Sequence, residues 1–92
     1  MKKLPALILF TLLSSAYAGE AEIRQSMQSK FPSIGKLEHI VKTPYAGLYE
    51  IVIDGQLLYT DEKGQYLFDG NIIETKSRRN LSDEQRRKLF AI

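Results

Sequence analysis

The first half of the chain contains one segment with the hydrophobic spacing of an amphipathic helix. Between residues 20 and 31, apolar residues recur every four positions at Ile23, Met27 and Phe31, which places them on one helix face. Pro32 follows directly and ends the predicted helix, because proline interrupts helical backbone hydrogen bonding. We therefore predict a helix over 20–31 that packs its apolar face against a core.

The segment after this helix alternates apolar and polar residues between glycine-containing turns. Tyr49, Ile51 and Ile53 fall on one face of an extended strand, and Asp54-Gly55 is typical of a tight hairpin turn. We predict an antiparallel meander with strands over 36–42, 48–54, 56–61 and 65–69, and a short last strand over 71–76.

One helix followed by such a meander predicts an α+β fold in which the helix covers one face of the sheet. Several strands carry apolar residues on both faces, and one helix cannot cover both. Four of these residues are therefore expected to make contacts beyond the helix: Leu58, Leu67, Phe68 and Ile73. The uncovered apolar surface favours self-association.

The N-terminus has the three parts of a secretory signal peptide. Lys2 and Lys3 precede an apolar run from Leu4 to Leu13, and a small-x-small triplet ends at Ala18. The run is short for a membrane span, which needs about 20 residues. We predict a signal peptide over 1–18, cleavage between Ala18 and Gly19, and no membrane association afterwards.

Charge and cysteine content narrow the possible functions. Without Lys2 and Lys3, the 13 basic residues fall to 11, equal to the 11 acidic residues, so the charge of the exported chain does not indicate a nucleic-acid partner. The chain contains no cysteine, which excludes disulfides and lipid attachment after the signal peptide. A domain of this size buries only about 60% of its unfolded surface, so a second copy is an expected source of further buried area.

Candidate catalytic and metal-ligating residues are scarce. His39 is the single histidine and has no cysteine or second histidine as a metal partner. Asp61-Glu62 is followed at once by Lys63-Gly64, which is typical of a solvated turn. We predict no catalytic residue, no metal site and no cofactor.

The C-terminal segment has the signals of a second helix. Ser82 occupies a capping position, with Gln85 three residues later, and Asp83 and Glu84 suit the positive end of the helix. The basic residues around this helix are interpreted as a solvated face. We expect 77–92 to be the truncated start of a linker helix.

At this point the glycine and apolar spacing of the meander identifies a family resemblance. The pattern consists of Tyr45-Ala46-Gly47-Leu48-Tyr49, Asp54-Gly55, Leu57-Leu58-Tyr59-Thr60-Asp61, Gly64 and Tyr66-Leu67-Phe68-Asp69-Gly70. It resembles the N-terminal domain of the periplasmic thiol:disulfide interchange proteins of the DsbC type, which are bacterial disulfide isomerases. The resemblance extends from about Glu20 to Lys76.

The resemblance implies a cystatin-like domain over 19–76 whose role is homodimerisation in the periplasm. In this family, linker helices carry thioredoxin-like catalytic domains with a Cys-x-x-Cys motif. The cysteine-free chain cannot perform that reaction, which would belong to a longer parent protein. The parent's implied partners are misfolded disulfide-containing periplasmic proteins, for which it would act as isomerase and chaperone, and a membrane thiol reductant.

The resemblance also implies a dimer interface on the last meander strand. Its residues are Tyr66, Leu67, Phe68, Asp69 and Gly70. An exposed strand edge offers unpaired N–H and C=O groups to a second copy, and Gly70 permits close backbone approach.

Two other interpretations remain open at the level of sequence. The chain could be a stand-alone secreted cystatin-like inhibitor or binding module, but the Gln-x-Val-x-Gly hairpin of such inhibitors is absent. Gln56 and Gln65 instead precede Leu-Leu-Tyr and Tyr-Leu-Phe. The chain could also be a truncated product without an independent role.

Overall fold

The protein combines helices with antiparallel strands. The structure, a computed structural model, describes residues 15–91. In chain order, the elements of this range are α2 (Ser15–Lys30), β1 (Leu37–Lys42), β2 (Tyr49–Ile53), β3 (Gln56–Thr60), β4 (Leu67–Phe68), β5 (Ile73–Glu74), β6 (Arg79–Asn80) and α3 (Leu81–Phe90). The α+β class predicted from the sequence is confirmed.

Strands β1 to β4 form an antiparallel sheet in the order β1-β2-β3-β4. The β2–β3 hairpin closes at Asp54 and Gly55, which have φ angles of 51° and 76°. Two successive residues with positive φ are the signature of a type I′ turn, whose twist matches that of the flanking strands. The hairpin predicted from Asp54-Gly55 is therefore present.

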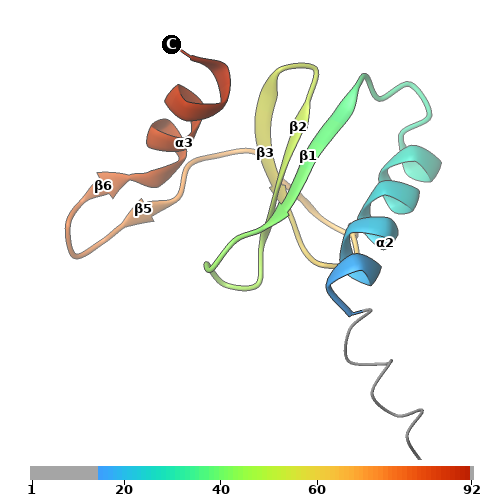
Figure 1. The fold of residues 1–92 in the computed structure, drawn as a ribbon, viewed down its shortest axis with the longest axis horizontal. Helices are drawn as coiled ribbons and strands as arrows, with labels where there is room; N and C mark the ends of the chain where they lie inside the picture. Colours follow the sequence, from blue (N-terminus) through green and yellow to red (C-terminus); the bar gives the residue numbers. More distant parts are fainter. Residues whose placement is uncertain (1–14, 92) are drawn as a thin grey trace, which may run out of the picture.

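One face of the sheet packs against α2, which lies beside the strands in Figure 1. Ile23 and Met27 of the helix are fully buried against the strand residues Ile40, Tyr49, Ile51, Ile53 and Leu58. The predicted apolar helix face is confirmed for these two residues. Phe31, by contrast, is 46% exposed, because α2 ends at Lys30 and the chain turns away at Pro32.

The opposite face of the sheet is covered by the C-terminal part of the chain. Val52, Leu57 and Tyr59 form a second cluster, against which Leu48, Ile72, Leu89 and Phe90 pack. In Figure 1, α3 and the β5–β6 hairpin accordingly lie on the other side of the sheet from α2. No segment was predicted from the sequence to cover this face. Leu58, which was expected to make contacts beyond the helix, is instead buried in the α2 cluster.

Helix α2 begins earlier than predicted. It already includes Ser15, the first described residue, and runs through Ala18 and Gly19, because alanine is a strong helix former and the segment from Ser15 to Lys30 contains no proline. Gly19 lies directly against the sheet: a Cβ atom there would be 2.3 Å from the Tyr49 hydroxyl oxygen. Residues 1–14 of the predicted signal peptide lie outside the described range.

The segment after the meander also differs from the prediction. The strand predicted over 71–76 is present only as β5, and it does not extend the sheet. It pairs with β6 in a separate hairpin, with Ile73 opposite Asn80. The chain leaves the sheet after β4 because Ile72 packs over the second apolar cluster.

The start of α3 also differs from the prediction. The N-cap is Asn80, whose side chain accepts a hydrogen bond from the Asp83 backbone N–H at 2.8 Å. Ser82 is inside the helix and fully buried. Its hydroxyl accepts the Ile72 N–H at 2.8 Å and bonds the Tyr59 hydroxyl, so tertiary partners occupy the oxygen that was expected to cap the helix.

Candidate functional site

The predicted interface segment lies at one edge of the sheet. Strand β4 pairs with β3 through Tyr59–Phe68 and Thr60–Leu67. Within residues 15–91, no strand pairs with its other side. This outer edge therefore presents backbone N–H and C=O groups that can pair with another chain.

The turn before β4 is organised by Asp61. Its carboxylate accepts the backbone N–H groups of Lys63 at 3.3 Å, Gln65 at 2.8 Å and Tyr66 at 2.8 Å. Partial burial alone would raise the pKa of Asp61, but the N–H groups of Tyr66, Lys63 and Gln65 together lower it below its ordinary value. Because these N–H groups bind Asp61, the strand predicted over 65–69 is regular only at Leu67 and Phe68.

Helix α2 holds this turn in place. The Ser26 hydroxyl donates to the Gly64 carbonyl oxygen at 2.8 Å. Gly64 has a φ of 67°, and a Cβ there would be 3.0 Å from the Ser26 Cβ and 3.2 Å from the Ile23 Cα. The Thr60 hydroxyl then donates to the Tyr66 carbonyl at 2.7 Å. The helix, the turn and β3 together fix where β4 lies.

All five residues of the predicted interface lie together in one exposed segment. Tyr66 is 66% exposed, Leu67 41% and Phe68 45%, and the surfaces of Asp69 and Gly70 are also open. Because residues opposite each other in a sheet share a face, Leu67 lies on the α2 face with Thr60, and Phe68 lies on the α3 face with Tyr59.

Gly70 has no role within its own chain that requires glycine. Its φ is not among the positive φ values of the described glycines, which belong to Gly47, Gly55 and Gly64. A Cβ atom at Gly70 would meet nothing within 4 Å. The fold of a single copy would therefore accept a side chain at this position.

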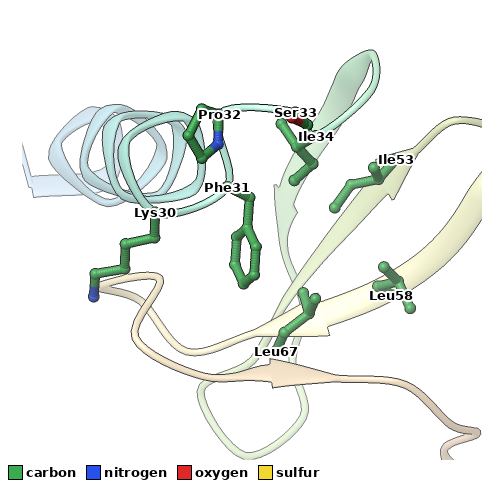
Figure 2. A pocket seen from close by; sticks show the side chains of 8 residues that line it. All are labelled: Lys30, Phe31, Pro32, Ser33, Ile34, Ile53, Leu58 and Leu67. Atoms are coloured by element: carbon green, nitrogen blue, oxygen red, sulfur yellow. The ribbon is translucent and has the colours of Figure 1, made fainter.

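An apolar pocket of about 460 Å³ opens beside β4 on the α2 face. Figure 2 shows the Phe31 ring and the Leu67 side chain extending toward each other, with Ile34, Ile53 and Leu58 to the right of the ring. This pocket was not predicted from the sequence, because the four-residue spacing placed Phe31 on the buried face of the helix. The sequence signal that could have indicated the pocket is Pro32, which ends the helix and leaves Phe31 at the rim of the pocket.

The polar candidates serve the fold. His39 Nε2 is 2.9 Å from the Glu50 Oε1 atom, to which Gln85 Nε2 donates at 3.1 Å, so these residues connect β1, β2 and α3. In the part of the chain that the structure describes, no group of three or more His, Cys, Asp or Glu side chains could hold a metal ion. No helix of this part is long and apolar enough to cross a membrane.

A sequence model of the family described as "Disulfide bond isomerase protein N-terminal domain" matches residues 14–83. The chain belongs to this family. These 92 residues contain no cysteine and therefore no Cys-x-x-Cys site, with which disulfide isomerases act.

Several curated relatives of this disulfide isomerase domain are thiol:disulfide interchange proteins. The probable protein DsbC of Bordetella pertussis is 41% identical over 51 residues, which cover 55% of this chain and 18% of that protein. The probable DsbC of Bordetella avium is 31% identical over 70 residues, which cover 76% of this chain and 24% of that protein. The DsbC of Haemophilus influenzae is 33% identical over 76 residues, which cover 80% of this chain and 31% of that protein. The chain thus matches less than a third of the length of these relatives.

Proposed function

We propose that this chain is a non-catalytic homodimerisation domain of a thiol:disulfide interchange protein. In this proposal, residues 19–76 form the dimerising unit and 77–92 begin a linker helix. Two copies pair through the outer edges of their β4 strands, and the interface consists of Tyr66, Leu67, Phe68, Asp69 and Gly70.

The open edge of β4 is the observation that carries the proposal. An exposed edge strand with large apolar side chains on it is a template for pairing with another chain. Tyr66, Leu67 and Phe68 are all more than 40% exposed in the single copy. Gly70 supports the same conclusion, because its lack of a side chain has no steric or conformational reason within its own chain.

The cellular setting of the proposal follows from the family. A thiol:disulfide interchange protein acts on disulfides, which persist in oxidising compartments such as the periplasm. We propose that residues 1–18 are a cleaved signal peptide that exports the chain there. A parent protein with a thioredoxin-like domain would act on misfolded disulfide-containing proteins and be reduced by a membrane thiol reductant.

Sedimentation equilibrium of the purified chain tests the proposal. We expect a dimer at micromolar concentration for the wild type, and a folded monomer for Gly70→Arg, because the arginine side chain obstructs close approach of the two edges. Gln28→Arg is a matched control, since it makes the same charge change at an exposed position of α2, away from β4.

The circular dichroism spectrum of Gly70→Arg should match that of the wild type, because a side chain at this position meets nothing in its own chain. A wild-type chain that remains monomeric at micromolar concentration contradicts the proposal. A Gly70→Arg variant that still forms the wild-type dimer contradicts the assignment of the interface.

A further inference from the structure

The pocket between Phe31 and Leu67 opens at the same edge of the sheet as the proposed dimer interface. Its inner wall consists of Ile34, Ile53 and Leu58, and its two rim residues remain nearly half exposed in the single copy. We propose that Leu67 of a second copy closes this pocket. The inference rests on β4 pairing and adds to it a side-chain site at Phe31, directly after the end of α2 and outside the interface segment 66–70.

Symmetry determines which side chains of the second copy can reach the pocket. Two antiparallel edge strands of identical chains are related by a two-fold axis perpendicular to the sheet, which keeps each face on its own side. Leu67 lies on the α2 face because it is opposite Thr60. The partner's Leu67 therefore also lies on the α2 face, next to the mouth of the pocket.

This conclusion holds for either central register of the two strands. If the axis passes midway between the two Leu67 residues, their side chains are directly opposite, with Cβ atoms about 4.5–5.5 Å apart. If the axis passes midway between the two Phe68 residues, the two Leu67 residues are diagonal neighbours about 7–8 Å apart, a distance that long side chains can bridge. In both cases the partner's Leu67 adjoins the Phe31 ring.

The length of β4 explains why the dimer needs this pocket. A regular strand of two residues provides only a few backbone hydrogen bonds. Stable interfaces bury at least about 1,000 Å² of total surface around an apolar centre. The Phe31–Leu67 pocket lies beside the paired edges and is lined mainly by apolar side chains, so filling it from both copies supplies the missing contact.

Phe31→Ala tests the inference because it removes the ring from the pocket without changing the β4 backbone. We expect the dimer dissociation constant, measured by sedimentation, to rise about tenfold or more, as when a central interface side chain is truncated. Ile73→Ala is the matched control: Ile73 is 48% exposed, like Phe31 at 46%, but lies on β5 outside the pocket. Its dissociation constant should stay within about twofold of the wild type.

A second readout uses the apolar dye anilinonaphthalene sulfonate. The Gly70→Arg monomer, whose pocket is open, should bind more dye than the wild-type dimer, and adding Phe31→Ala to it should reduce that binding. An unchanged dissociation constant for folded Phe31→Ala, beside a monomeric Gly70→Arg, overturns the pocket inference and leaves the dimerisation proposal intact. Equal dye binding by the dimer and the monomer also overturns it. A monomeric wild type overturns both.

Discussion

The Tyr59 and Ser82 hydroxyl groups share a buried hydrogen bond that joins the sheet to helix α3. Tyr59 is 3% exposed and Ser82 is fully buried. The Ser82 oxygen also accepts a hydrogen bond from the Ile72 N–H at 2.8 Å. One hydroxyl group of α3 therefore connects this helix both to β3 and to the segment that precedes β5. Burial raises the pKa of Tyr59 above its ordinary value, which keeps the phenol protonated and able to donate.

Ser82→Ala should therefore destabilise the fold. The substitution leaves the Tyr59 hydroxyl and the Ile72 N–H without their partner, and a buried unsatisfied polar group costs about 1–3 kcal/mol. The free energy of unfolding, measured by urea titration, should fall by about this amount. Ser29→Ala, at an exposed position of α2, is the control and should change it by less than about 0.5 kcal/mol.

Ser82 also shows where sequence reasoning reaches its limit. The spacing Ser82-x-x-Gln85 is a local helix-start signal, and it correctly predicted a helix in this region. The choice between Ser82 and Asn80 as N-cap, however, depends on Tyr59, which is 23 residues away in sequence. Tertiary hydrogen bonds of this kind leave no periodic pattern in the chain.

The sheet was more predictable because its signals are local. The alternation correctly placed Tyr49, Ile51 and Ile53 on one face, which the structure shows packing on α2, and Asp54-Gly55 correctly predicted the hairpin. The pocket was not predictable in this way. It depends on where α2 ends relative to Leu67, which is a property of the packed layers.

Two glycines near β4 should respond oppositely to alanine. Gly64 has a φ of 67° and its Cβ position is crowded by Ile23 and Ser26, so Gly64→Ala should lower the free energy of unfolding by at least about 1–2 kcal/mol. Gly70→Ala should leave it equal to or above the wild-type value, because the position is open. Urea unfolding of both variants at a concentration where the chain is monomeric checks this contrast. Equal destabilisation by the two substitutions would contradict the description of the turn.

The stability of the chain should depend on the ionisation of Asp61. Its folded pKa is below its ordinary value of about 3.9, so its contribution to the free energy of unfolding is present above that value. This contribution is lost as the pH falls through the lower, folded pKa. Urea unfolding at several pH values between about 6 and 2.5 should show the loss for the wild type and a flatter profile for Asp61→Asn.

Glu84 also has a pKa below its ordinary value, because the Arg79 side chain donates hydrogen bonds to it. This pair is unchanged in Asp61→Asn, so the difference between the two profiles reports Asp61 alone. Parallel profiles for wild type and variant would show that the Asp61 hydrogen bonds do not hold the turn.

Deuterium uptake by the backbone of residues 66–70, measured by mass spectrometry at increasing protein concentration, is the most direct test of pairing through β4. The proposal predicts that uptake in this segment slows as the chain dimerises, because outward-facing N–H groups of the edge become hydrogen-bonded to the second copy. Uptake in the exposed β5–β6 turn should not change with concentration. If the 66–70 segment exchanges equally fast in the monomer and in the dimer, the two copies do not pair through this edge.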